Sequence, residues 1–167
     1  MSATFQPQTG HTMRLYRNTG THPTPVWNHV NEIGDLTISD LSRILAQLKR
    51  RANGFTKNLP SLIDSIAVEF RLHWGLGKTQ YDGIRNDFFN ATVREWAIMN
   101  GAIETSGNQG LTAPFIVEQF PWEQPLENVS GHDVRLAVGY KEDETNGGEL
   151  DPYWYVVGTT TTTTTTT

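Results

Sequence analysis

The alternation of apolar and polar residues in short segments is the feature that most constrains this chain's fold. Apolar residues occupy the even positions from Ile66 to Leu72, and polar or charged residues occupy the odd positions from Glu69 to His73. Successive side chains of a β-strand point to opposite faces, so this pattern predicts a strand with one buried face. The segment Asp133–Lys141 alternates in the same way, with Val134, Leu136, Val138 and Tyr140 on one side.

Further short segments have strand-like composition, and one segment is helical. We expect strands at Met13–Arg17, Val26–Val30, Gly34–Ile38, Val93–Met99, Leu111–Phe120 and Tyr153–Val157. Thr79–Ala91 predicts a helix, because Tyr81, Ile84 and Phe88 form one apolar stripe and Thr79 can cap its start. The sequence therefore predicts an α+β, mainly β fold, with two packed antiparallel sheets in a sandwich or barrel and one flanking helix.

The segment Leu41–Leu48 fits two structures. Leu41, Ile44, Leu45 and Leu48 have the spacing of one helix face. The even positions from Ala46 to Ala52 could equally be one side of a strand. Asn53-Gly54 then marks a turn. Both interpretations stay open from sequence alone.

Composition narrows the function classes. The 167 residues fit one domain, and cysteine is absent, which excludes disulfides, thiolate metal sites and a cysteine nucleophile. The sequence contains no stretch of eighteen apolar residues, so we predict no membrane-spanning helix. Residues 1–94 carry 11 Lys/Arg against 7 Asp/Glu, and residues 95–167 carry 2 against 11. This asymmetry is either ordinary solvated surface or two surfaces of opposite sign that meet between copies.

Two segments come close to ligand-binding motifs but fail on spacing. Gly75-Leu76-Gly77-Lys78-Thr79 resembles a phosphate-binding loop, yet the position that needs the first glycine is Leu72. Glu142–Asp151 is rich in oxygen ligands, but a calcium loop needs Asp first and Glu twelfth, where this chain has Glu142 and Tyr153. We therefore predict no cofactor, no metal and no enzyme activity. An enzyme would have to depend on His73, His132 or Lys78.

Two other features suggest contacts with a partner. The only basic cluster is Lys49-Arg50-Arg51, with Phe55 and Lys57 close by. It is either a solvated loop or a contact with an acidic neighbouring copy. Trp122 lies between Pro121 and Pro125, where it either seals a core edge or anchors an interface. The candidate subunit-interface residues are Lys49, Arg50, Arg51, Phe55, Lys57 and Trp122.

The order of these segments resembles that of a known family. The segments concerned are Val30–Ile38, Lys49–Phe55 with Lys57–Pro60, Ile66–Leu72, Tyr81–Phe89, Gly107–Gly110, Leu111–Phe120 with Pro125-Leu126, and Asp133–Tyr140. Together, from about Val26 to Val157, they resemble the phage major tail tube proteins of long-tailed phages.

This resemblance implies a structural protein of the virion. Residues 1–158 would form one β domain with a long arm loop around 39–62, followed by a threonine tail, Thr159–Thr167. Six copies would close into a ring, and rings would stack into a hollow tube with an acidic lumen through which DNA passes. Its partners would be itself, the tape measure, the terminator and the baseplate. Assembly would take place in the host cytoplasm, and the tube would be located in the phage tail. The threonine run and the helical spacing of Leu41–Leu48 depart from the family pattern.

Two alternatives remain beside the tube subunit. A tail terminator or an injection-machine tube subunit would have a similar fold. A small β-barrel that binds a ligand belongs to a different class, and it would need a closed apolar interior.

Overall fold

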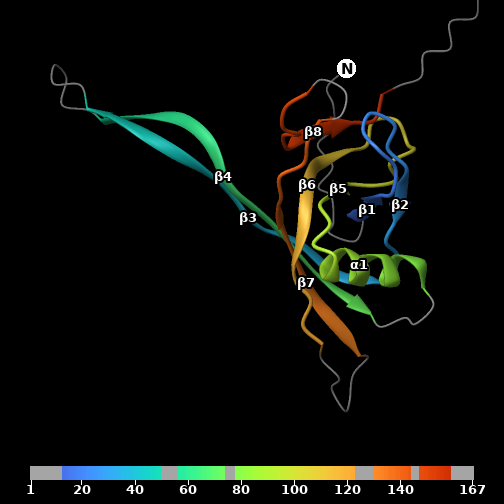
Figure 1. Ribbon diagram of the computed structural model, residues 1–167. Helices are drawn as coiled ribbons and strands as arrows, with labels where there is room; N and C mark the ends of the chain where they lie inside the picture. The colour runs from blue at the N-terminus through green and yellow to red at the C-terminus, as the bar shows by residue number, and fades with distance from the viewer. Residues whose placement is uncertain (1–12, 50–55, 74–77, 123–129, 144–146, 159–167) are drawn as a thin grey trace, which may run out of the picture. The chain divides into compact units, whose positions relative to one another are not determined.

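The structure, a computed structural model, describes residues 13–49, 56–73, 78–122, 130–143 and 147–158, with only the backbone for 43–49 and 56–64 (Figure 1). These residues form eight strands and one helix, which confirms the predicted mainly β class. The elements are β1 (Arg14–Asn18), β2 (Trp27–His29), β3 (Ile33–Lys49), β4 (Thr56–His73), α1 (Thr79–Phe89), β5 (Arg94–Met99), β6 (Gln109–Gln119), β7 (Gly131–Val138) and β8 (Tyr153–Val156). The helix has 11 residues, and no helix in the described ranges is long and apolar enough to cross a membrane.

The chain divides into two compact units that share strand β6. The first unit contains the residues up to Asn31, Arg94–Pro114 and the residues from Tyr140 onward. The second contains Glu32–Val93 and Phe115–Gly139. The chain enters the second unit twice, and β6 passes from one unit to the other between Pro114 and Phe115.

The first unit is an open antiparallel sheet with the strand order β2-β1-β5-β6-β8. Strand β5 is buried along five successive residues, Glu95–Met99. Tyr16, Ala97, Met99 and Ile103 form a buried cluster, against which Trp27, Tyr155 and Val157 pack. The Tyr16 hydroxyl accepts a hydrogen bond from the Ile103 N–H at 3.1 Å, which ties the loop after β5 to the core.

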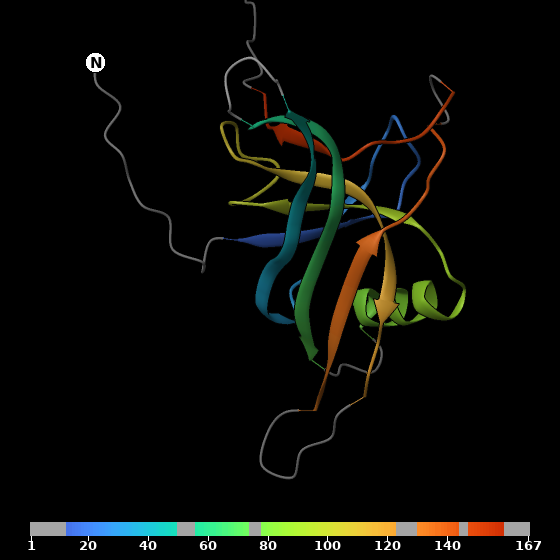
Figure 2. The same ribbon diagram turned by 90° about the vertical axis from the view of Figure 1, so that its left-hand side faces the viewer.

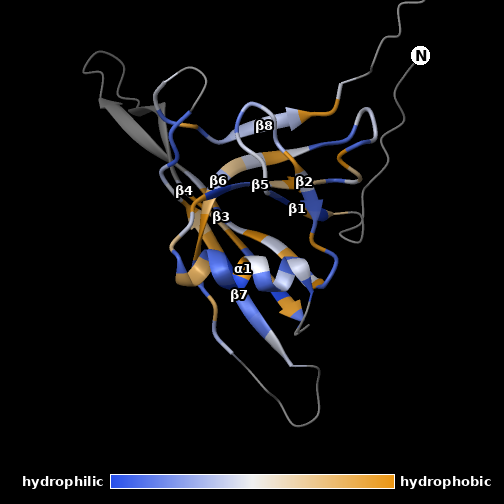
Figure 3. Cartoon of the chain, turned by 45° about the vertical axis from the view of Figure 1, so that its right-hand side comes forward, coloured by the Kyte–Doolittle hydropathy of each residue, from blue (hydrophilic) through white to orange (hydrophobic). Residues whose placement is uncertain are grey.

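The second unit is an open antiparallel sheet, β6-β7-β4-β3, with α1 on one face. The predicted alternation in β4 is confirmed, because Ile66, Val68, Phe70 and Leu72 are all buried. On β7, Val134 and Leu136 are buried, whereas Val138 is exposed at the strand's end and Tyr140 belongs to the other unit. In Figure 3, β6 is largely hydrophobic, whereas α1 shows both colours because it buries only one side.

The start of α1 differs from the prediction. Lys78, with φ −87° and ψ 121°, is the N-cap, and no side chain caps the helix. Thr79 is therefore already the first helical residue, so its hydroxyl does not occupy the capping position. The helix ends at Phe89, and Asn90 is the C-cap.

Strands β3 and β4 form a hairpin that reaches well beyond the rest of the second unit. Each residue pair from Leu41↔Ile66 to Lys49↔Thr56 belongs to an antiparallel ladder with several register shifts. The helical interpretation of Leu41–Leu48 is therefore wrong, because pairing with a distant strand overrides local spacing. The predicted arm loop around 39–62 is largely this pair of strands, and only residues 50–55, at its tip, lie outside the described residues.

We call residues 42–65 of this hairpin the arm. The strand β7 pairs with β4 only over Ala67–His73, so among the described strands those of the arm pair only with each other. Figures 1 and 2 show the arm extending away from β7 and α1. An isolated two-stranded ribbon is marginal in water, so the arm is the part of this unit that most needs further contacts.

Candidate assembly surfaces

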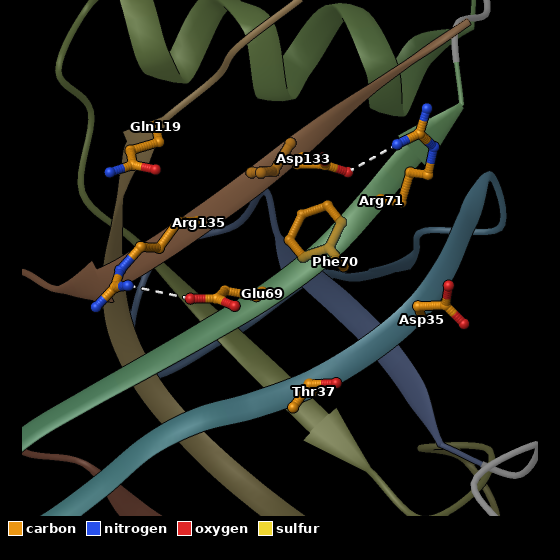
Figure 4. Close-up of a pocket in the computed structure, with 9 residues that line it drawn as sticks. Asp35, Thr37, Glu69, Phe70, Arg71, Gln119, Asp133 and Arg135 are labelled. Carbon is orange, nitrogen blue, oxygen red and sulfur yellow. Dashed lines mark hydrogen bonds and ion pairs between the residues drawn. The ribbon is translucent and has the colours of Figure 1, made fainter. Parts of the chain in front are cut away.

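The face of the second unit's sheet opposite α1 is polar and carries a ladder of ion pairs. Arg71 Nη1 lies 3.1 Å from Asp133 Oδ1, across β4 and β7 (Figure 4). Arg135 Nη1 lies 3.0 Å from Glu69 Oε1, and its Nε lies 2.9 Å from Glu118 Oε2 on β6. The alternation that buries one face of β4 and β7 places these charges on the other. This face is charged but internally paired.

A shallow hollow of about 480 Å³ lies on this polar face. Asp35, Thr37 and Gln119 line it together with the paired residues of the ladder. Counting Glu118, four carboxylates (Asp35, Glu69, Glu118, Asp133) surround two guanidinium groups, so the net charge of the face is negative. Such a surface repels polyanions rather than binding them.

A buried hydrogen-bonded pair holds the segment after β6. The Tyr81 hydroxyl lies 2.7 Å from His132 Nε2, and His132 Nδ1 lies 3.1 Å from the Pro121 carbonyl oxygen. Because a carbonyl can only accept, Nδ1 carries the proton, and Nε2 accepts from the Tyr81 O–H. Burial lowers the pKa of His132 and raises the pKa of Tyr81. The neutral imidazole therefore anchors Pro121 beneath α1.

Next to this pair, an aromatic row reaches the surface. The rings of His132 and Phe120 stack with centroids 4.1 Å apart, and Trp122 lies 5.9 Å from His132. The side chain of Trp122 is 62% exposed, and that of Phe89 at the end of α1 is 74% exposed. Trp122 therefore does not seal a core edge, and its role as an interface anchor stays a prediction.

The structure brings two of the predicted basic residues to one place. Lys49 is the last residue of β3, and Lys57 pairs with Leu48 on β4, so both lie at the far end of the arm. Arg50, Arg51 and Phe55 lie outside the described residues, as does the threonine run Thr159–Thr167.

The first unit ends in an exposed edge strand, β8. It pairs with β6 from Gln109↔Val156 to Thr112↔Tyr153 and with no other described strand. Tyr155 packs against the buried cluster, whereas Trp154 and Val156 are 61% and 54% exposed. The Trp154 indole N–H donates to Gln109 Oε1 at 2.9 Å, which fixes the ring over the surface.

The residues on which an enzyme would depend are not brought together. His132 is buried beneath α1, whereas His73 lies at the end of β4 among the residues of the opposite face, and Lys78 is exposed at the start of α1. Gly75–Gly77 lie outside the described residues. In the parts of the chain that the structure describes, no three His, Asp or Glu side chains are grouped to hold a metal ion.

Sequence reasoning missed the Tyr81–His132 pair and the exposed face of β8. The signal for His132 was present, because it has the same parity as Val134 and Leu136, which predicts burial. The partner Tyr81 is 51 residues away, and only the fold reveals that contact. For β8, the sequence Tyr-Trp-Tyr-Val indicates a strand but does not show which side stays uncovered.

Comparison with known proteins identifies the fold. No family model and no curated protein matches the sequence. Three solved structures are similar over most of both chains. A chain of the SPP1 tail tube is 12% identical, with a TM-score of 0.64, and covers 90% of this chain and 81% of its own. A chain of the tail of an empty gene transfer agent particle, refined with C6 symmetry, is 12% identical, with a TM-score of 0.60 and coverage of 87% and 98%. A chain of the sheath/tube terminator of an extracellular contractile injection system is 11% identical, with a TM-score of 0.58 and coverage of 82% and 96%.

Proposed function

We propose that the chain is a structural subunit that assembles with copies of itself into stacked rings, forming the hollow tube of a phage tail. The observation that carries this proposal is the fold, which is shared over at least 80% of both chains with the SPP1 tail tube and the gene transfer agent tail. The particle tail refined with C6 symmetry supports six copies per ring.

The surfaces of the chain suit that role. Both units are open sheets, whose outermost described strands are β2 and β8 in one and β3 in the other. Exposed strand edges tend to pair with another chain, and closing a ring of copies removes them. Aromatic side chains such as Phe89 and Trp122 lie on the surface, where a neighbouring copy could cover them.

The polar face of the second unit is the surface that we assign to the lumen. Its four carboxylates and two guanidinium groups leave a net negative charge. A negative wall lets DNA pass without sticking, because phosphates are repelled. In this proposal the tape measure occupies the same channel, while the terminator and baseplate close the two ends. The tube would form in the host cytoplasm and become part of the virion.

The test is electron microscopy of the purified protein in negative stain, over a range of protein concentrations. We expect hollow filaments of constant width, and sedimentation should show a sharp critical concentration. A protein that stays strictly monomeric at high concentration, without any added tail protein, would overturn the proposal.

A second candidate is the terminator of such a tube. It is supported by the likeness to the sheath/tube terminator and to the tube-terminating cap of the anti-feeding prophage, which has a TM-score of 0.58. The same micrographs separate the two, since a terminator forms single rings that do not stack. The ligand-binding barrel has less support, because the described strands of each unit form an open sheet rather than a closed interior.

A further inference from the structure

Strand β8 has a free hydrogen-bonding edge. The Val157 N–H donates to the Asn108 carbonyl at 2.8 Å, and the Val157 carbonyl accepts from the Gly107 N–H at 3.0 Å. In an antiparallel strand, alternate residues direct their backbone groups toward the same neighbour. Tyr155 therefore also faces β6, whereas Trp154 and Val156 direct their N–H and carbonyl groups to the opposite side, where no described strand lies.

The same two residues expose apolar side chains. More than half of the surface of both Trp154 and Val156 is accessible. From Tyr153 to Val156 the strand has no proline and no charged residue, which are two of the devices that protect an edge. An edge that is both unpaired and apolar indicates a site where another strand is added.

Charge identifies the strand that fits this edge. The segments on both sides of β8, residues 140–158, contain five acidic residues and one basic residue. Glu142, Glu149 and Asp151 among them are exposed. In contrast, the arm contains five basic residues and one acidic residue, Asp64; the basic ones are Arg43, Lys49, Arg50, Arg51 and Lys57.

The arm also offers a free edge. Strand β3 pairs only with β4 among the described strands, so its outer edge is open along its whole length. Its sequence from Ile44 to Leu48 is mostly aliphatic, a composition that suits contact with an apolar strand face.

We propose that the arm of one copy docks on β8 of a second copy, with β3 extending the sheet at the free edge and the basic residues facing the acidic segments. This inference rests on the proposed tube, and it specifies which two surfaces meet. The contact is heterologous, because each copy gives its arm and receives another copy's arm on a different surface. Contacts of this kind propagate into rings or helical assemblies.

Charge reversal tests the pairing. Lys49→Glu with Arg51→Glu on the arm, or Glu149→Lys with Asp151→Lys beside β8, should each raise the critical concentration for tube formation at least about tenfold, because like charges then face each other. In the chain that carries all four substitutions, the critical concentration should return to within about threefold of the parent's. Lys78→Glu, a single charge reversal at the exposed start of α1, is the control for charge change away from the arm and β8, and it should have no effect.

A backbone substitution tests the strand edge separately. Val156→Pro removes an N–H that points away from β6, so the pairing with β6 should survive while the free edge is blocked. Val156→Thr keeps the N–H and the β-branched shape and is its control. We expect tubes from the threonine variant and none from the proline variant, with unchanged far-UV circular dichroism and monomer melting for both.

The outcomes separate the two proposals. Parent protein that forms no tubes or rings contradicts the proposed function. Parent tubes that persist unchanged in both charge-reversed variants and in Val156→Pro contradict the docking of the arm on β8 and leave the tube standing. Carbodiimide crosslinking of tubes assembled from mixed ¹⁴N and ¹⁵N protein shows whether the arm and β8 belong to different copies. We expect a Lys49–Glu149 crosslink that joins a ¹⁴N peptide to a ¹⁵N peptide. A Lys49–Glu149 crosslink without such mixed pairs would place the arm on its own chain and overturn the proposal.

Discussion

The two halves of the β3–β4 hairpin have the same backbone pairing but different surroundings. Near its base, β4 lies between β3 and β7, and its apolar residues Ile66, Val68, Phe70 and Leu72 are buried. In the arm no other described strand pairs with these two. The base is thus stabilised by this chain's own core, whereas the arm has the marginal stability expected of a two-stranded ribbon. Leu41, at the boundary, is already 60% exposed. The comparison separates residues that fold the chain from residues that, in the proposed tube, would join copies.

The largest effect on the monomer should come from the base of the hairpin. Phe70 is 2% exposed, and Phe70→Ala should lower the free energy of unfolding by about 3–5 kcal/mol, because it leaves a cavity in the core. Urea unfolding of both proteins, at concentrations below the critical concentration for tube assembly, measures this difference in free energy. A loss under about 1 kcal/mol would mean that this core contributes little, and the contrast with the arm would fail.

A smaller change in the free energy of unfolding should come from the titration of His132 with pH. Burial depresses its pKa in the folded state, so below the unfolded pKa of about 6.5 the unfolded state binds more protons. The stability that the neutral imidazole contributes is therefore fully present above about pH 6.5 and is lost as the pH falls through the folded pKa. The slope for one such proton is at most about 1.4 kcal/mol per pH unit.

His132→Gln is the matched variant, because glutamine does not titrate in this range. Unfolding curves at a series of pH values from 4.5 to 8 should show a weaker dependence on pH in the variant than in the parent. Parallel curves for the two proteins would show that burial does not lower the pKa of His132 in the folded state.

The ion pairs of the polar face should contribute still less to the free energy of unfolding. Arg71 and Asp133 are partly exposed, with side-chain accessibilities of 27% and 54%. Solvent screens such pairs, so Arg71→Gln should lower the free energy of unfolding by only about 0.2–1 kcal/mol. A double-mutant cycle with Asp133→Asn measures the coupling. A coupling energy well above this range would mean that the ion pairs of this face contribute substantially to the stability of the fold.

These contrasts also show what the sequence could and could not predict. Alternation from Ile66 to Leu72 predicted the buried face of the base, because one strand's own pattern records which side is covered. The same reasoning could not determine the structure of Leu41–Leu48. Its spacing is helical, but in the structure it is a strand that pairs with residues near Leu59, and no local pattern reveals that pairing. The basic cluster around Lys49 was recognised as a candidate contact. The free edge of β8 was not, because exposure depends on which neighbours are missing.

The smallest effect on the monomer should come from removing the arm, although that change should have the largest consequence for assembly. Leu41 and Ile66 lie opposite each other in the ladder, so a two-residue Asn-Gly turn can join them directly and close the shortened hairpin. We expect the free energy of unfolding to change by less than about 1 kcal/mol, because among the described strands the excised ones pair only with each other. Tubes should be absent in negative stain at any concentration at which the parent assembles. If the shortened chain unfolds instead, the arm belongs to the fold, and the distinction between the two halves of the hairpin is wrong.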